Sequence, residues 1–448
     1  MAVAKRKSSS KAAAAGKKAA VAASGSPESS RPSGSGGLKN LSGLVHASEL
    51  WTGAGFRIKD GIRVTREDAG VVNDGALIWD SKGQVVFAGA VSAMPREVRA
   101  GLKTSSVRDL DRKQAVTPGW VDCHTHLVFA GNRASEFSRR CAGATYEEIA
   151  REGGGIQATV SATRAMQKKD LLALARDRVR EAYAWGVRAL EIKSGYGLDL
   201  QTEVKILEVA QSLKKEFPLI RFHITWLGAH AVPKGEVRAD YVQALLREQL
   251  PLVAKKKLAD SADIFVDEGY FTLDDARAVL TAAREAGLKI RVHADELGNT
   301  ESARLAAQMG ALSADHLLCI SDAGIQALAR SSTVAVLLPG TAYYLKKPHA
   351  PARRLIESGA RVAVSTDFNP GTCMTQSLPW IMNLSALYLG MAAHEILCAT
   401  TYNAAKALGM ESEIGTLEAG REACHTVLPF STFEECFYRV GWVPSNAP

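Results

Sequence analysis

Eight short apolar segments recur along residues 116–410, and this recurrence limits the possible folds more than any other feature of the chain. Each has the length and composition of a buried strand. The segments are 120–126, 187–193, 219–227, 262–268, 289–295, 312–318, 333–338 and 361–367. Helical stretches lie between most of them, for example 170–185, 199–216 and 272–286. Eight strands that alternate with helices predict an α/β fold, a (β/α)8 TIM-type barrel.

A doubly wound sheet is the alternative arrangement for this alternation. It would need a glycine-rich phosphate-binding turn directly after its first strand, and no such turn follows 120–126. The run Gly153-Gly154-Gly155 lies in a long loop instead of between a strand and a helix. It therefore predicts a flexible loop that can touch a ligand, not a phosphate site.

The segments on either side of the barrel have the character of β-structure. Ala76–Trp79 and Val85–Ala88 flank Asp80-Ser81-Lys82-Gly83, where glycine suits the positive φ of a hairpin turn. We expect residues 44–115 and 411–448 to form one small discontinuous β-sandwich domain, drawn from both sides of the barrel sequence.

The first 43 residues are rich in Ala, Ser, Lys and Gly and contain few large apolar side chains, which predicts a disordered tail. Eight Lys and Arg residues and one Glu within residues 1–40 account for nearly all of the net charge of +8. The favoured interpretation is a solvated leader. Nucleic-acid binding by this tail is the alternative.

Two further features bear on the location of the protein. The sequence has no apolar run of the length that crosses a membrane and no apolar secretory segment at its start. Its seven cysteines are scattered and form no C-x-x-C pair. These features predict a cytoplasmic protein with reduced thiols and no membrane partner.

His124 and His126 lie at the end of the first predicted strand, after the turn-like sequence Thr117-Pro118-Gly119-Trp120. Residues i and i+2 of a strand point to the same side, so the two imidazoles face one direction. Neutral imidazole binds zinc or iron well. The pair alone is weak evidence, because many histidines are hydrogen-bonded core or rim residues.

Side chains that can bind metal or substrate recur at the ends of other predicted strands, where the chemistry of a barrel gathers. They occur in Lys193–Gly197, at His230, in His293–Glu296, in Asp315–His316 and in Ser365–Thr372.

Each of these residues also has a purely structural interpretation. His230 can hold a loop, His316 can be a rim residue, and Asp367 can cap a turn. Lys193 can pair with Glu191 or lie at the rim. Cys123 is more easily explained as a packing residue than as a nucleophile.

Taken together, these stretches resemble the amidohydrolase superfamily of metal-dependent hydrolases over about residues 44–430. The resemblance rests on Thr117–Asn132 with the following Arg133–Phe137, and on Lys193–Gly197, Trp226–Pro233, His293–Glu296 and Ser365–Thr372. Within the superfamily the chain is similar to the members that hydrolyse 4-imidazolone-5-propionate to N-formimino-L-glutamate in histidine degradation.

The resemblance implies a role for individual residues. It implies one divalent ion, zinc or iron, with the ligands His124, His126, His293 and Asp367. It implies that the substrate and product are bound by Arg133, Tyr196, His230, Glu296, Asn369, Gly371 and Thr372. It makes His316 a further active-site histidine, and a homodimer is common among such relatives.

The chemistry of the residues agrees with these roles. Three imidazoles and one carboxylate leave room for a water molecule, whose pKa a divalent ion lowers from about 15.7 to about 7. The fourth predicted strand has no lysine that could bridge two metals, so one ion is expected. Glu296 is the expected proton carrier, and His316 competes with it as base or carbonyl polariser. Arg133 offers a planar fork for the propionate.

Two other functions fit parts of the sequence. A nucleobase deaminase of the same superfamily would lack a carboxylate for Arg133 to bind. A barrel that serves only as a scaffold would not need all four types of ligand. One departure from the family pattern is Cys424, which follows Ala423 where relatives usually have Asp, and it puts the packing of the β-domain in question.

Overall fold

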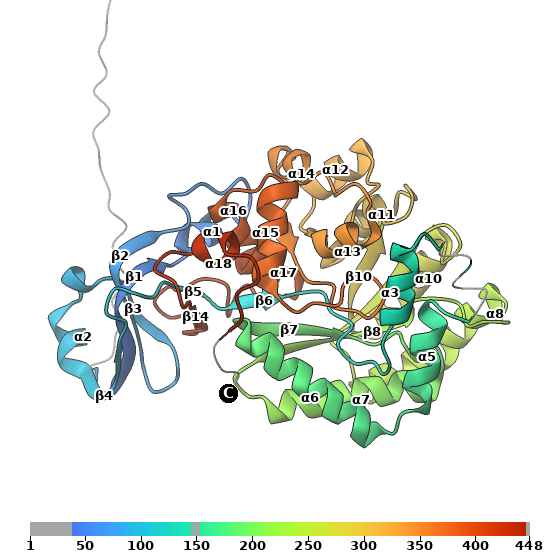
Figure 1. Cartoon of the computed structure of the whole chain (residues 1–448), viewed down its shortest axis with the longest axis horizontal. Coiled ribbons are helices and arrows are strands. Elements are labelled where there is room, and N and C mark those ends of the chain that lie inside the picture. Colours follow the sequence, from blue (N-terminus) through green and yellow to red (C-terminus); the bar gives the residue numbers. More distant parts are fainter. Residues whose placement is uncertain (1–37, 145–147, 149–152, 445–448) are drawn as a thin grey trace, which may run out of the picture. The chain divides into compact units, whose positions relative to one another are not determined.

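Eight parallel strands form one nearly closed sheet whose order follows the chain from β6 to β13. Figure 1 labels β6, β7, β8 and β10 of this sheet. The computed structural model describes residues 38–144, 148 and 153–444. The strands are β6 (Trp120–Asp122), β7 (Val187–Lys193), β8 (Arg221–Ala229), β9 (Ser261–Val266), β10 (Lys289–Ala294), β11 (Ser313–His316), β12 (Val334–Leu337) and β13 (Val362–Val364). The predicted (β/α)8 barrel is confirmed. Because the strand order never reverses, the doubly wound alternative is wrong.

Helices connect the barrel strands, and the three predicted from the sequence appear as α6 (Lys168–Ala184), α7 (Leu200–Glu216) and α10 (Leu273–Glu285). α10 begins with a capping box between Thr272 and Asp275. The other helices of this region are α3 (Ala134–Cys141), α5 (Ile156–Ala165), α8 (Arg238–Ala244), the π-helical turn Leu245–Gln249, α9 (Leu250–Lys255), α11 (Ser302–Met309), α12 (Asp322–Ala329), α13 (Pro339–Leu345), α14 (Ala352–Ser358), α15 (Leu378–Tyr388), α16 (Ala393–Thr400), α17 (Tyr402–Ala407) and α18 (Glu435–Tyr438).

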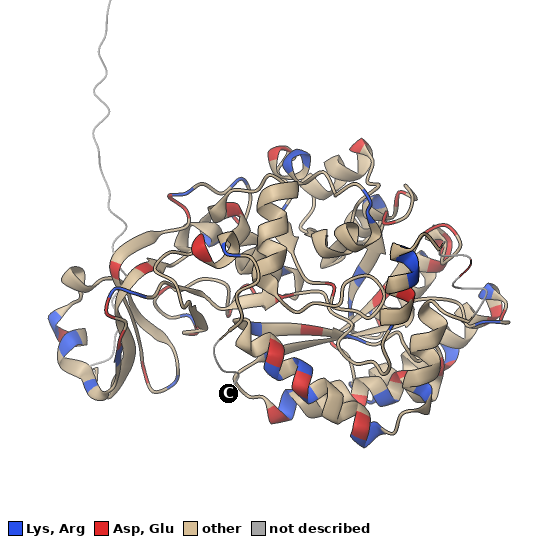
Figure 2. Cartoon of the chain, viewed as in Figure 1, with Lys and Arg blue, Asp and Glu red and all other residues tan. Residues whose placement is uncertain are grey.

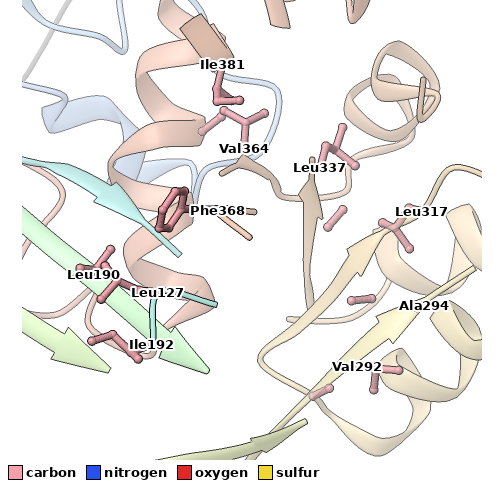
Figure 3. Packing of buried hydrophobic residues seen from close by; sticks show 14 of the residues in the cluster. Leu127, Leu190, Ile192, Val292, Ala294, Leu317, Leu337, Val364, Phe368 and Ile381 are labelled. Atoms are coloured by element: carbon pink, nitrogen blue, oxygen red, sulfur yellow. The ribbon is translucent and has the colours of Figure 1, made fainter. Parts of the chain in front are cut away.

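Several barrel strands, β7 among them, alternate between apolar and charged side chains. Along β7, Leu190 and Ile192 belong to the large apolar cluster between strands and helices (Figure 3). Glu191 and Lys193 alternate with them and are also fully buried. Because successive side chains on a strand point to opposite sides, these charged residues face the barrel interior. The interior of this barrel therefore contains buried charged side chains beside β7.

The barrel closes between its first and last strands through side chains as well as backbone. The Asp122 carboxylate accepts hydrogen bonds from the Ser365 hydroxyl, from Thr366 N–H (3.1 Å) and from the Thr366 hydroxyl (2.7 Å). One residue pair, Thr125 and Phe368, forms a parallel bridge just beyond the strands. This closure places the chain after β13 directly beside the chain after β6.

A separate six-stranded sheet is formed by segments from both sides of the barrel sequence. Its strands are β1 (Leu41–Trp51), β2 (Val71–Trp79), β3 (Val85–Ala90), β4 (Leu102–Asp109), β5 (Val116–Pro118) and β14 (His425–Val427), with the short helices α1 (Ala54–Ile58), η1 (Val91–Ala93) and α2 (Arg96–Gly101) between them. β2 and β3 pair antiparallel around Asp80–Gly83, and Gly83 has a φ of 77°, so the predicted hairpin is confirmed.

β14 pairs antiparallel with β5, so the later part of the chain joins the sheet begun by the earlier part. The six strands belong to one hydrogen-bonded sheet, with an apolar cluster around Leu50 and Leu77 and another around Leu41 and Ile78. β1 begins at Leu41, slightly before the boundary predicted at residue 44. Residues 1–37 of the predicted tail lie outside the described residues.

Cys424, where the chain departs from the family pattern, packs against a glycine. Gly119 N–H donates to Cys424 O (2.8 Å), and a Cβ at position 119 would lie 2.6 Å from the Cys424 sulfur. The thiol therefore fits because residue 119 has no side chain.

The outer helices α6 and α7 carry interleaved acidic and basic side chains (Figure 2). Ion pairs such as Lys168–Glu208 (2.7 Å) and Arg176–Glu216 (2.6 Å) join them.

Within the part of the chain that the structure describes, no helix is both long and apolar enough for a membrane crossing.

Candidate metal centre and active site

His124 and His126 follow β6 in an extended segment that pairs with the segment after β13. His124 N–H donates to Ser365 Oγ (2.8 Å), Asp367 N–H donates to His124 O (3.0 Å), and His126 N–H donates to Phe368 O (2.9 Å). Both imidazoles are buried. The closure of the barrel thus brings Asp367 to the two histidines.

Asp367 and His293 extend this pair to a group of four. Asp367 Oδ1 lies 3.4 Å from His124 Nε2 and 3.6 Å from His126 Nε2. The His293 ring, at the end of β10, is centred 4.6 Å from the His124 ring. Burial raises the pKa of Asp367 to about 7. A cation beside this carboxylate would offset that effect and keep it ionised.

Buried carboxylates lie beside Nδ1 of two of these rings, and the one at His124 is hydrogen-bonded to it. Asp315 Oδ2 lies 2.7 Å from His124 Nδ1, and Asp263 Oδ2 lies 2.9 Å from His293 Nδ1. A carboxylate at Nδ1 favours the tautomer that keeps its proton there, which leaves the Nε2 lone pair free. His124 Nε2 is buried and has no hydrogen-bond partner among the described residues. The residues therefore fit a metal ion in this group.

His316 and Glu296 lie next to the same group. His316 ends β11, and its ring centre is 5.2 Å from that of His293. Its Nε2 lies 3.5 Å from Glu296 Oε2, and the Glu296 side chain is only 10% exposed. Burial, with added repulsion from Asp367 and Asp267, raises the pKa of Glu296 well above its usual value. A carboxyl with a raised pKa is suited to general acid–base catalysis.

Left-handed backbone conformations mark three of the strand ends. Asp295, His316 and Asp367 have φ values of 48°, 77° and 51°. Such conformations cost about 1–3 kcal/mol each for residues other than glycine. The Asp295 carboxylate accepts hydrogen bonds from Thr300 and Ser302, and so fixes the turn that carries Glu296.

Tyr196 and His230 form one wall beside His126. The His230 ring stacks on His126 with centres 5.0 Å apart, and the Tyr196 ring lies 5.7 Å from His126. His230 Nδ1 bonds the backbone oxygen of Gly195 at 3.0 Å. Burial and the nearby His293 lower the pKa of His230 to about 4, so this imidazole is neutral at pH 7.

The loop that carries Tyr196 is held by Glu203, a buried residue of α7. Its carboxylate accepts hydrogen bonds from the N–H groups of Gly195 (3.0 Å), Gly197 (2.7 Å) and Leu198 (3.0 Å). Sequence reasoning did not single out Glu203. A carboxylate in the first turn of the helix after a glycine-rich strand end is the signal that would have indicated it.

Arg133 lies beside the loop that follows Asp367. Its Nε donates to Glu136 Oε2 (2.8 Å), and Glu136 also accepts from Gly155 N–H. A Cβ at Gly371 would lie 2.3 Å from Arg133 Nη1. The guanidinium is therefore held on one edge by Glu136 and packs against the Gly371 backbone.

Asn369 organises that loop from within. Its Oδ1 accepts from the N–H groups of Gly371 and Thr372 (both 2.8 Å), and its Nδ2 donates to Asp367 O (2.7 Å). Asn369 thus connects the backbone of Asp367 to that of Gly371, against which Arg133 packs.

The sequence-predicted residues thus gather in two neighbouring sets. The first contains His124, His126, His293, Asp367, His316, Glu296, Tyr196 and His230, and the second contains Arg133, Asn369, Gly371 and Thr372. Lys193 does not lie at the rim. It is fully buried and pairs with Glu191, as one of the two interpretations predicted.

The amidohydrolase family model matches residues 115–437, so this chain belongs to the amidohydrolase family. Two solved structures share its fold at 16% sequence identity. A zinc-bound adenosine deaminase from Xanthomonas campestris has a TM-score of 0.64 and covers 91% of this chain and 88% of its own. A 5-methylcytosine deaminase from Klebsiella pneumoniae has a TM-score of 0.66 and covers 89% of this chain and 94% of its own.

Relatives with higher sequence identity identify the family to which the chain belongs within the amidohydrolases. The imidazolonepropionase of Brevibacillus brevis is 42% identical over 400 residues, which cover 89% of this chain and 94% of that protein. That of Symbiobacterium thermophilum is 43% identical over 403 residues, with 89% and 93% covered. Within the amidohydrolases, the chain belongs to the imidazolonepropionase family.

Proposed function

We propose that this chain hydrolyses the cyclic amide C–N bond of 4-imidazolone-5-propionate and releases N-formimino-L-glutamate, a step of histidine degradation. The observation that carries the proposal is the 42% identity to an imidazolonepropionase over nearly the whole length of both chains. The deaminase structures share 16% identity with the chain and support the fold alone.

His124, His126, His293 and Asp367 would hold one divalent ion, zinc or iron. The buried Nε2 of His124 without a partner, and the carboxylates behind His124 and His293, support this ligand set. When bound, such an ion lowers the pKa of water and polarises a carbonyl group.

Glu296 would be the principal proton carrier. The reaction forms a bond between water oxygen and the ring carbonyl carbon and breaks the bond from that carbon to the adjacent ring nitrogen. The proton lost by water must reach this nitrogen. Glu296 is buried and has a raised pKa, so it suits both acceptance and return of the proton. His316, 3.5 Å from Glu296, competes for this role or polarises the carbonyl.

Arg133 would bind the propionate arm. Its Nε donates to Glu136, and its Nη1 lies against Gly371, where a Cβ would be 2.3 Å away. Tyr196 and the neutral His230 would orient the ring. Asn369, Gly371 and Thr372 would contact the formimino-glutamate product.

The test is a direct comparison of substrates with the purified, metal-loaded chain. We expect loss of the imidazolone absorbance with one formimino-glutamate formed per substrate consumed, and no ammonia from cytosine or guanine. His124→Ala should abolish this turnover together with bound metal. Ammonia release from a nucleobase without imidazolone turnover would replace the proposal with a deaminase, and metal-free inactive protein would favour a scaffold.

Two finer statements belong to the same proposal. We infer a homodimer, which sedimentation of the purified chain tests. We also infer a cytoplasmic location, in keeping with seven cysteines that form no disulfide. Fractionation of cells that express the chain tests this location.

A further inference from the structure

Lys193 is a fully buried cation in the interior of the barrel, below the proposed metal ligands. Its Nζ lies 2.7 Å from Asp263 Oδ2, 2.9 Å from Glu191 Oε1 and 3.7 Å from Asp315 Oδ2. All four side chains have no exposed surface. A buried ammonium is costly unless carboxylates surround it, and here three of them do.

Two of these carboxylates are those that face the ligand histidines. Asp263 Oδ2, the oxygen nearest Lys193, also lies 2.9 Å from His293 Nδ1. Asp315 Oδ2 lies 2.7 Å from His124 Nδ1. One ammonium therefore lies beside both carboxylates that face these imidazoles, of which His124 follows β6 and His293 belongs to β10.

Arg291 and Glu191 complete the network. Arg291 donates to Asp315 Oδ2 (3.0 Å) and to the backbone oxygen of Cys123 (2.8 Å), next to His124. Glu191 Oε1 lies 3.3 Å from Arg291 Nε and accepts from the Thr225 hydroxyl. Two cations and three carboxylates give this buried cluster one net negative charge.

We propose that Lys193 is a positioning residue that fixes Asp263 and Asp315 together, and through them the orientation and Nδ1–H tautomer of His293 and His124. The inference rests on the proposed metal ligands. The Lys193 ammonium contacts carboxylates, so its effect on the ligand histidines passes through Asp263 and Asp315. Second-layer partners of this kind typically change metal affinity about 10- to 100-fold.

Replacement of Lys193 distinguishes a positioning role from a purely electrostatic role, because the two roles predict opposite changes in metal affinity. Lys193→Met makes the cluster more negative, so a purely electrostatic role predicts tighter binding of a divalent cation. A positioning role predicts weaker binding, because both carboxylates lose the group that fixes them. The sign of the change in metal affinity therefore decides between the two.

The experiment measures Zn²⁺ affinity by chelator competition, and the visible spectrum of the Co²⁺-loaded chain. We expect Lys193→Met to weaken Zn²⁺ binding about 10- to 100-fold and to alter the Co²⁺ spectrum, with partial recovery in Lys193→Arg. Arg188→Met is the matched control. It removes a partly buried cation from the other end of β7, where Arg188 donates to Tyr183 O and Val187 O.

Unchanged or tighter Zn²⁺ binding in folded Lys193→Met would overturn the inference, as would an equal loss in Arg188→Met. If Lys193→Met does not fold, Glu191→Gln/Lys193→Met keeps the net charge of the cluster and is judged by the same criteria.

The tautomers of His124 and His293 can also be measured directly in the unaltered chain. ¹⁵N NMR of the metal-free, histidine-labelled protein should show the Nδ1–H tautomer for both His124 and His293, and the Nε2–H tautomer in either would contradict the inference. Full Zn²⁺ affinity in His124→Ala would instead overturn the proposed metal site itself.

Discussion

Two histidine–carboxylate pairs in this molecule have the same nitrogen–oxygen distance but different surroundings. His124 Nδ1 and Asp315 Oδ2 are 2.7 Å apart at the barrel mouth, and neither side chain is exposed. His46 Nδ1 and Asp74 Oδ1 are also 2.7 Å apart, in the small sheet, with side-chain exposures of 28% and 39%.

The surroundings decide what each pair can do. Burial alone would raise the pKa of Asp315, but Arg291 and Lys193 hold it below the usual value. The buried carboxylate stays charged and fixes one edge of His124, so the opposite nitrogen is left for a ligand. The exposed pair has Arg112 and solvent as additional partners, and water screens its attraction. Distance alone does not identify a functional pair.

Glu296→Gln, at the buried barrel mouth, should have the largest effect on activity. It tests whether the buried surroundings of the mouth are what makes its side chains functional. The amide cannot accept and return a proton, so kcat should fall about 100- to 10,000-fold. Bound metal and the Kd for a substrate analogue should stay close to those of the unaltered chain. The exposed Glu285→Gln on α10 serves as the control. A kcat near that of the unaltered chain would remove Glu296 from the mechanism.

Asp315→Asn tests the buried pair directly. The amide keeps the shape of the side chain but removes the negative charge of the carboxylate, which both Arg291 and His124 contact. Metal affinity should therefore fall about 10- to 100-fold. Metal titration of the apo chain measures this. Asp74→Asn, the equivalent change in the exposed pair, should leave metal affinity unaltered. Equal effects from the two variants would contradict the contrast between them.

Arg133→Ala should act mainly on substrate binding. The loss of hydrogen bonds to a carboxylate, worth about 1.5–3 kcal/mol, should raise KM about 10- to 100-fold with a smaller change in kcat. Arg133→Lys keeps the charge but loses the planar fork, so it should be intermediate. Glu136→Gln should produce a smaller rise in KM. An unaltered KM in Arg133→Ala would refute the proposed contact with the propionate arm.

The smallest effect is expected in the exposed pair. Hydrogen bonds from His46 and Arg112 lower the pKa of Asp74. This carboxylate therefore contributes stability above its unfolded pKa of about 3.9, and the contribution disappears as pH falls through the folded value. Thermal unfolding should show a slightly lower melting temperature for Asp74→Asn at pH 7 and no difference in acid. A difference that grows in acid would contradict this sign.

Local patterns in the sequence were enough to predict the barrel. The strand 187–193 and the helix 199–216 each agree with the structure within a residue at either end, because apolar runs and capping residues mark them. His124 and His126 were recognisable because the i, i+2 spacing on a strand fixes their common direction. The gathering of the other site residues followed from a fold whose strand ends meet at one mouth.

The supports of these histidines could not be predicted in the same way. Asp263 and His293 face each other because β9 and β10 pair in one particular register, in which His293 lies opposite Phe265. Asp315 reaches His124 across the barrel, and Lys193 contacts carboxylates from three strands. These contacts depend on register and barrel closure, which no single segment of sequence encodes.

The most direct measurement is anomalous X-ray scattering at the metal absorption edge from crystals of the metal-loaded chain. One peak per chain is predicted, bounded by His124 Nε2, His126 Nε2, the imidazole of His293 and Asp367 Oδ1. Two peaks at the mouth, a peak elsewhere, or a peak from which His293 or Asp367 stands apart would contradict a single ion held by residues from three strand ends.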